Sequence, residues 1–316
     1  MESRGEFVMK KKILLAVDGS NHSKNAVKYV CKISLLVKEL SYTLFNVQPT
    51  VSWRVREEAP QDARARARAE LEKISRNNAE DARRFLEEFK TLMVGLGEEE
   101  ERIDAVTQPK VEGTAKDILE YARNGAYDAI VVGRRGHSLL REVFMGSTSS
   151  NLLEHARDIP VWVVDGDVTS AKILLAADGS ESSIRAAEHL SFMAGQSPDV
   201  RITLFHVVIE KSAPGVFAVD GFIDDFVMEE DQRHIEDFHA RACRMFKDAG
   251  IPEDRIETKE ACRTGNVGKA IMAEVKKGDY GTVVVGRRGV NRAFFMGSVS
   301  KYVLNRTEGR ALWVVS

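Results

Sequence analysis

Cysteine is scarce in this sequence, with Cys31, Cys243 and Cys262 the only three among 316 residues. Three thiols so widely spaced exclude a disulfide framework and a cysteine-based zinc site. No apolar run approaches the ~20 residues that span a bilayer, and the first residues, MESRGEFVMKKK, lack the apolar core of a signal peptide. We therefore expect a cytoplasmic protein with no membrane partner.

Net charge is also small, since 46 basic residues oppose 48 acidic ones. This balance excludes a polycation that holds nucleic acid by neutralising phosphates. One local basic run is interrupted by acidic residues and has no aromatic ladder, so we interpret it as a solvated helix face and expect no nucleic-acid partner. Its members are Arg54, Arg56, Arg64, Arg66 and Arg68.

Catalytic motifs are missing as well. The sequence contains no G-x-S-x-G elbow, H-E-x-x-H, C-x-x-C or Walker A pattern. His206, His234 and His239 lie in one half of the chain, but a separation of five places His234 and His239 on different helix faces. We expect no catalytic residue and no metal site made by the protein alone.

The chain does contain a repeat of a whole domain. KILLAVDGS at 12–20 returns as KILLAADGS at 172–180, and YDAIVVGRRG at 127–136 returns as YGTVVVGRRG at 280–289. The shorter blocks TLFNV, FMGSTS and VWVV also return in the same order. A period of ~150 residues has the size of a domain. We place the domains at 1–166 and 170–316, joined by a short polar stretch.

Short apolar runs alternate with helical patterns inside each copy. The runs 13–17, 42–47, 129–132 and 161–164 are nearly all apolar, which is typical of parallel strands covered on both faces. Helical spacing predicts helices over 23–40, 63–96, 114–124 and 147–156. The order βαβαβαβαβ predicts an α/β fold with one doubly wound parallel sheet of five strands in each half.

A ligand site is expected beyond the first and fourth strands, because doubly wound sheets bind ligands at the carboxyl ends of their strands. The fourth strand runs into Gly133 and Gly136, and Gly146 and Ser147 then open a helix. Glycines let backbone N–H groups approach a ligand, and a helix start offers unpaired donors to phosphate. Asp18 follows the first strand at the same edge, so the pattern predicts a mononucleotide site.

Each half resembles a domain of the universal stress protein family, whose nucleotide motif is G-x2-G-x9-G-(S/T). Gly133, Gly136, Gly146 and Ser147 match this motif in full, and the resemblance covers nearly the whole chain. It implies an adenine-nucleotide alpha-hydrolase-like fold that binds ATP or another adenine nucleotide, with Mg²⁺ near Asp18. A carboxylate beside a triphosphate repels it unless a cation intervenes.

The resemblance also implies individual roles in the first domain. Val17 and Asp18 would line the adenosine pocket, Val47 would meet adenine through its backbone, and Arg135 and Thr148 would lie along the phosphates. The whole implied set is Val17, Asp18, Val47, Val132, Gly133, Arg135, Gly136, Gly146, Ser147 and Thr148. Asp18 and its counterpart Asp178 also suit a turn, since D-G-S is a favourable turn sequence.

The second domain departs from the motif, because seven residues rather than nine separate Gly289 from Gly297. Two missing residues remove up to ~7 Å of extended reach. The sequence leaves open whether this shorter loop can surround a phosphate. The corresponding positions are Ala177, Asp178, Val207, Gly286, Arg288, Gly289, Gly297, Ser298 and Val299.

The last strands of the two halves, 161–164 and 312–315, are apolar and each carries a Trp. An unpaired apolar edge strand invites pairing. We therefore predict that the halves dock as a pseudo-two-fold pair through antiparallel final strands, as single-domain family members do. A homodimer of the whole chain stays open. The GRRG arginines fit either phosphate contact or pairing across the domain interface.

These observations favour an ATP-binding stress-response regulator or chaperone-like binder whose conformation follows nucleotide occupancy and which acts on an unidentified protein partner. A site without a positioned base favours retention of the nucleotide over turnover. Two alternatives stay open. One is a slow ATP-hydrolysing or phosphotransfer enzyme, and the other is an interaction scaffold that binds no nucleotide.

Overall fold

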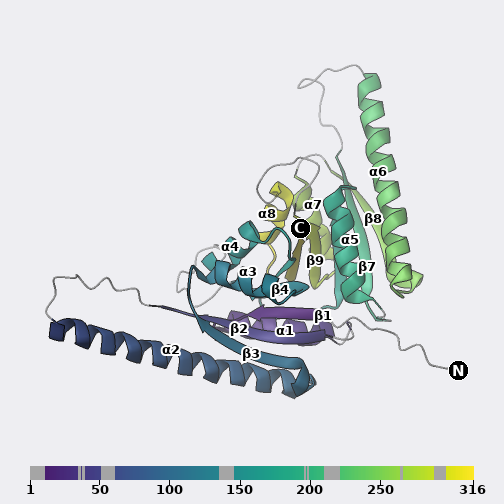
Figure 1. Ribbon diagram of the computed structural model, residues 1–316. Coiled ribbons are helices and arrows are strands. Elements are labelled where there is room, and N and C mark those ends of the chain that lie inside the picture. The colour runs from purple at the N-terminus through teal and green to yellow at the C-terminus, as the bar shows by residue number, and fades with distance from the viewer. Residues whose placement is uncertain are drawn as a thin grey trace.

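The computed structural model describes residues 11–34, 37, 40–50, 61–134, 146–195, 197, 199–209, 221–263, 266–287 and 297–316. Over these residues both halves repeat one order of strands and helices (Figure 1). The first half contains β1 (Lys11–Ala16), α1 (Asn21–Ser34), β2 (Leu40–Gln48), α2 (Gln61–Gly95), β3 (Ile103–Pro109), α3 (Thr114–Asn124), β4 (Ala129–Gly133), α4 (Ser147–His155) and β5 (Val161–Val164). The second contains β6 (Lys172–Ala177), α5 (Glu181–Ala194), β7 (Arg201–Ile209), α6 (Gly221–Asp248), β8 (Ile256–Arg263), α7 (Val267–Lys277), β9 (Thr282–Gly286), α8 (Ser298–Leu304) and β10 (Ala311–Val315).

The predicted elements of the first half are present with one correction. The helix expected over 23–40 ends at Ser34, because Leu40 already pairs with Lys11 as the first residue of β2. The sequence predicted five strands in each half but assigned residues to only four of them in the first half. The strand without assigned residues is β3. Its side chains are mostly polar or half-exposed because it is the edge of the sheet, so an apolar pattern does not reveal it.

The ten strands of the described residues form one sheet in the order β3-β2-β1-β4-β5-β10-β9-β6-β7-β8. The neighbours within each half are parallel, as the fold class predicts. In the first half the chain moves outward from β1 through β2 to β3, then crosses back to form β4 on the other side of β1. The direction of winding therefore reverses between β1 and β4, and this reversal creates a switch point at their carboxyl ends.

Helices cover both faces of the sheet, and the two hydrophobic cores run through both halves. Helices α1, α2, α5 and α6 pack on one face, and α3, α4, α7 and α8 pack on the other. Neighbouring strand residues alternate between the cores, as Leu14 and Leu15 do, which explains why the strands are apolar throughout. Cys31 lies in the first core, and burial raises the pKa of its thiol to about 12.

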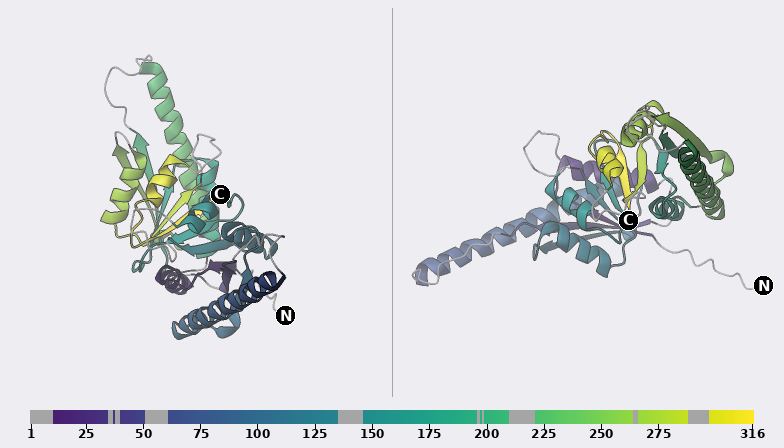
Figure 2. Two further views of the ribbon diagram at one scale, coloured as in Figure 1. Left: turned by 90° about the vertical axis from the view of Figure 1, so that its left-hand side faces the viewer. Right: turned by 90° about the horizontal axis from the view of Figure 1, so that it is seen from above.

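The long helix α2 carries the described part of the basic run. Arg64, Arg66 and Arg68 are exposed on it, which agrees with a solvated helix face, whereas Arg54 and Arg56 lie outside the described residues. Figure 2 shows the amino-terminal part of α2 projecting beyond the sheet. Over the part of the chain that the structure describes, no helix combines the length and the apolar character that crossing a membrane requires.

The two halves of the structure meet through their final strands, which pair antiparallel. β5 pairs with β10 so that Trp162 lies opposite Trp313. Their rings stack with centroids 3.8 Å apart and planes 1° from parallel, and both side chains are fully buried. Each indole N–H donates to the opposite half: Trp162 to His189 Nε2 at 3.1 Å, and Trp313 to the Tyr29 hydroxyl at 2.8 Å.

Lowering the pH from 7.5 to 5.5 is expected to destabilise the fold by about 1 kcal/mol through His189. Burial beneath the indoles lowers the pKa of His189 from 6.5 to about 3. Between these values the unfolded chain holds the proton and the folded chain does not, so stability falls as the pH drops through 6.5. Urea denaturation at both pH values should show a smaller loss in His189→Gln, whose amide still accepts the indole N–H. An equal loss in both proteins would contradict this role.

Candidate nucleotide site of the first domain

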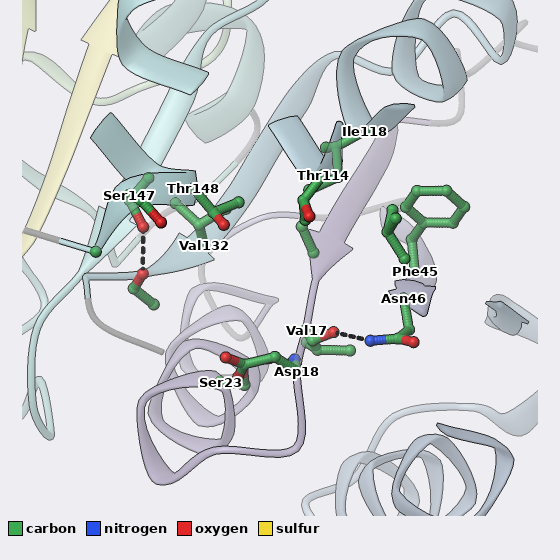
Figure 3. Close-up of a pocket in the computed structure, with 15 residues that line it drawn as sticks. Val17, Asp18, Ser23, Phe45, Asn46, Thr114, Ile118, Val132, Ser147 and Thr148 are labelled. Carbon is green, nitrogen blue, oxygen red and sulfur yellow. Dashed lines mark hydrogen bonds between the residues drawn. The ribbon is translucent and has the colours of Figure 1, made fainter. Parts of the chain in front are cut away.

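A cavity of about 220 Å³ lies at the switch point, where β1 and β4 end side by side (Figure 3). Residues from β1, β2, β4, α1, α3 and α4 form its wall, so segments far apart in the sequence meet there. Its lining comprises Ala16, Val17, Asp18, Ser23, Phe45, Asn46, Val47, Thr114, Ile118, Val132, Gly133, Gly146, Ser147, Thr148 and Ser149.

One end of the cavity is apolar, and a hydrogen bond from β2 to the residue after β1 fixes its shape. Val17 after β1, Val47 in β2 and Ile118 in α3 are buried and all line the cavity. Asn46 Nδ2 donates to the carbonyl oxygen of Val17 at 2.8 Å, and Thr107 Oγ1 donates to Asn46 Oδ1 at 3.2 Å. Asn46 therefore fixes the backbone that leaves β1, and the resulting apolar slot suits a flat ring such as a base.

The D-G-S turn after β1 brings Asp18 to the cavity. Its Oδ1 atom accepts from the backbone N–H of Ser20 at 3.1 Å and from the Ser23 hydroxyl at 2.7 Å. Gly19 has φ +73°, a left-handed conformation that favours glycine, and Ser20 Oγ accepts from the backbone N–H of Ser23 where α1 begins. The turn role expected for Asp18 is thus present, and Asp178 has the same contacts with Ser180 and Ser183.

The opposite end of the cavity is polar and lies at the start of α4. Ser147 and Thr148 lie across the cavity from Val17 and Asn46 (Figure 3). Ser149 Oγ donates to the carbonyl oxygen of Gly133 at 2.8 Å, which ties the first turn of α4 to the end of β4. The unpaired N–H groups of a first helical turn attract anions.

Gly133 has a packing role that spacing alone did not reveal. A Cβ atom at this position would lie 2.7 Å from the carbonyl carbon and oxygen of His22, in the first turn of α1. Gly286, its counterpart, has the same close approach to Ser182. These glycines let the first helix of each half pack directly against the end of a central strand.

Most residues predicted for the first-domain site share this one cavity. Val17, Asp18, Val47, Val132, Gly133, Gly146, Ser147 and Thr148 all line it. Arg135 and Gly136 lie outside the described residues. The sequence analysis missed Ala16, Ser23, Phe45, Asn46, Thr114, Ile118 and Ser149. Asn46 carried a usable signal, since it is an amide directly between Phe45 and Val47 in a buried strand.

The second domain repeats the switch point but changes one wall. β6 and β9 are parallel neighbours. The corresponding residues are Ala177 at the end of β6, Asp178 just after it, Val207 in β7, Gly286 at the end of β9, and Gly297, Ser298 and Val299 at the start of α8. Arg288 and Gly289 lie outside the described residues. His206 occupies the position of Asn46 and contacts the carbonyl oxygen of Ala177 through Nδ1 at 3.0 Å. A bulkier ring therefore stands where the first domain has an amide.

The first arginine of each GRRG sequence faces the other half of the chain. Arg134 contacts Asp165 Oδ2 at 2.7 Å and reaches carbonyl oxygens after α8, and Arg287 reaches carbonyl oxygens at the end of α4. Of the two roles left open, these arginines have the interface role. Among the described residues, no cluster of three or more histidine, cysteine, aspartate or glutamate side chains is arranged to hold a metal ion.

The fold and the cavity define a class of protein: a tandem pair of doubly wound α/β domains joined into one sheet, with a pocket at a switch point. A family model described as the universal stress protein family matches residues 9–165 and again 170–314. The chain belongs to the universal stress protein family.

Individual relatives agree with this assignment. A universal stress protein of Mycolicibacterium smegmatis is 28% identical over 205 residues, which cover 63% of this chain and 64% of that protein, so the match spans less than two thirds of the relative. The structure of a universal stress protein from Archaeoglobus fulgidus is similar with a TM-score of 0.64 at 20% identity, covering 96% of this chain and 98% of that one. A functionally unknown protein from Pseudomonas aeruginosa has a TM-score of 0.51 at 15% identity, covering 97% and 92%. These two structures show the fold.

Proposed function

We propose that this protein is an ATP-binding regulator of the stress response whose nucleotide site is the cavity of the first domain. The observation that carries the proposal is the meeting of eight predicted site residues around one cavity at the switch point. The apolar slot at Val17, Val47 and Ile118 would take the base. The start of α4, with Ser147 and Thr148, would take the phosphates.

The residues present fit an adenine nucleotide with its cation. The cavity of about 220 Å³ is smaller than the ~300–1,000 Å³ of common ligand pockets. It would therefore hold the base and sugar, while the phosphates extend along Gly133 and Gly146. Asp18 lines the same cavity, and its carboxylate would tolerate a triphosphate only with a cation such as Mg²⁺ between them.

Retention of ATP is favoured over rapid hydrolysis. Among the described lining residues, Asp18 is the only ionisable one, and its Oδ1 atom already accepts two hydrogen bonds of the turn. A general base needs to reach the attacking water. Incubation with ATP and Mg²⁺, followed by mass spectrometry of bound and released nucleotide, separates the three possibilities: retained ATP supports a regulator, released ADP a slow enzyme, and no bound nucleotide a scaffold.

Titration calorimetry is expected to find about one tight ATP per chain. The second domain has the shortened loop and places His206 where the first has Asn46, so its site should bind ATP much more weakly. Inserting two residues after Gly289 should strengthen the second binding event if loop length is the obstacle. The same insertion with His206→Asn tests the second difference. Two equivalent tight sites in the unaltered protein would contradict the asymmetry.

A further inference from the structure

Two buried arginines cross the junction in opposite directions. Arg134 follows β4 and Arg287 follows β9, and their side chains are only 2% and 3% exposed. Arg134 donates to the carbonyl oxygens of Asn305 at 3.0 Å and Thr307 at 2.9 Å, just beyond α8. Arg287 donates to the carbonyl oxygens of Glu154 and Ala156, at the end of α4. Each domain thus holds the end of a helix that belongs to the other.

The contact of Arg287 with α4 meets a specific physical need. The last four carbonyl groups of a helix have no partner inside the helix, and the dipole leaves this end negative. The guanidinium is a planar fork of N–H donors with a permanent positive charge, so one side chain can satisfy both Glu154 and Ala156. The Ala156 carbonyl oxygen also accepts from the Ser316 hydroxyl at 2.9 Å, so Glu154 is the group that depends on the arginine. Because the contact is buried, leaving the Glu154 carbonyl without this donor would be costly.

Helix α4 is short enough to connect this contact with the cavity. It contains nine residues, Ser147–His155, which corresponds to ~14 Å of helix. Ser147, Thr148 and Ser149 in its first turn line the cavity, and Arg287 contacts the last turn. Leu152 and Leu153 between them are buried in the core. A helix this short moves as one body, so an anchor at its end also sets the position of its beginning.

We propose that Arg287, supplied by the second domain, is a positioning residue for the nucleotide site of the first domain. It holds the carboxyl end of α4 and thereby places the donors of the first turn against the phosphates. This inference rests on the proposed function, since the cavity must bind a nucleotide for the placement to matter. It also gives the second domain a role in the first site that does not require ATP in its own shortened loop.

The test compares Arg287→Met with the matched variant Arg134→Met. Both remove an equally buried arginine from the junction, but the Arg134 side chain reaches the chain beyond α8 and not α4. Calorimetry should show ATP binding to the first domain about fivefold weaker or more in Arg287→Met, and less than twofold weaker in Arg134→Met. Arg287→Lys keeps the charge but loses the fork, so its affinity should fall between those of the unaltered protein and Arg287→Met.

Hydrogen exchange gives a readout that does not depend on ATP. The amides of α4 should exchange faster in Arg287→Met, and those of α8 faster in Arg134→Met. Fluorescence of the buried Trp162 and Trp313 shows whether the halves stay docked in each variant. The comparison of two helices within one protein stays informative even where a variant lowers overall stability.

The outcomes of these measurements distinguish a failure of the positioning role from a failure of the proposed function. Wild-type ATP affinity in Arg287→Met would overturn the positioning role and leave the proposed function standing. Equal weakening by both variants would also overturn it, because domain docking in general would then be the cause. If the unaltered protein binds no ATP, the proposed function fails. Faster exchange confined to α4 in Arg287→Met would then still support the anchoring of that helix, and unchanged exchange would refute it.

Discussion

The double variant Val163→Asp/Val314→Asp is expected to separate the two halves of the chain. Both valines are 2% exposed in the paired strands β5 and β10, and their side chains belong to the second hydrophobic core. A buried carboxylate without a partner costs several kcal/mol. Two of them approach the whole stability of a typical domain, ~5–15 kcal/mol. The contact between β5 and β10 should therefore open. Opening at this contact lets water reach both carboxylates and leaves the other strands of each half paired.

Separation would expose Trp162 and Trp313, which are fully buried against each other. In a Trp53→Phe background, which leaves Trp162 and Trp313 as the only tryptophans, the emission should shift to longer wavelength and be quenched by acrylamide, while far-ultraviolet circular dichroism keeps its α/β character. A protease should also cut within the linking stretch 165–171. The control Val163→Ala/Val314→Ala stays apolar and should keep the shielded emission. Shielded tryptophans in the aspartate variant, with circular dichroism unchanged, would show that the strand contact does not hold the halves together.

Gly146→Val is expected to weaken ATP binding by at least tenfold. The branched side chain would stand beside the first turn of α4, where the phosphates are proposed to accept hydrogen bonds from the backbone. Losing one charge-assisted hydrogen bond costs about 1.5–3 kcal/mol, which corresponds to roughly ten- to a hundredfold in affinity. Gly146 has φ −55° and ψ 145°, which valine adopts readily, so the variant should fold normally.

The second domain offers a matched control for this substitution. Gly297 precedes α8 as Gly146 precedes α4, with φ −57° and ψ 152°. Gly297→Val should therefore leave the tight ATP site unchanged, and both variants should melt close to the unaltered protein. If Gly146→Val binds ATP as tightly as the unaltered protein, the start of α4 does not bind the phosphates. A loss confined to Gly297→Val would place the tight site in the second domain, and equal losses in the two variants would show that the effect is not specific to the first-domain site.

Much of the fold follows from local patterns. The strands at 13–17 and 129–132 are apolar on both faces because helices cover both sides of a parallel sheet. The turn at Asp18–Ser20 is visible because Asp, Gly and Ser each have a turn preference of their own. The edge strand β3 could not be located from the sequence, for the opposite reason. Its exposed positions need no apolar residue, so it has neither an apolar run nor a clean alternation.

The candidate site was visible only in part. Gly133, Gly146 and Ser147 belong to a motif with fixed spacing, and the resemblance to the family implied five more of the lining residues. Asn46, Thr114 and Ile118 come from β2 and α3, and nothing in their own neighbourhoods points to β1. Asn46 lies at the cavity because the parallel strands β1 and β2 end at the same edge of the sheet. Thr114 and Ile118 lie there because α3 packs on one face of the sheet and leads into β4.

The sequence by itself determined the tandem repeat, the α/β class, the switch-point motif and the apolar final strands, because each depends on residues within one element or on direct identity between the two copies. Only the tertiary structure decided the partners across the junction. Trp313 meets Tyr29, and Arg134 meets Asn305 from 171 positions away. Such contacts depend on how two strands register in the folded sheet, and residue spacing along a chain carries no record of that register.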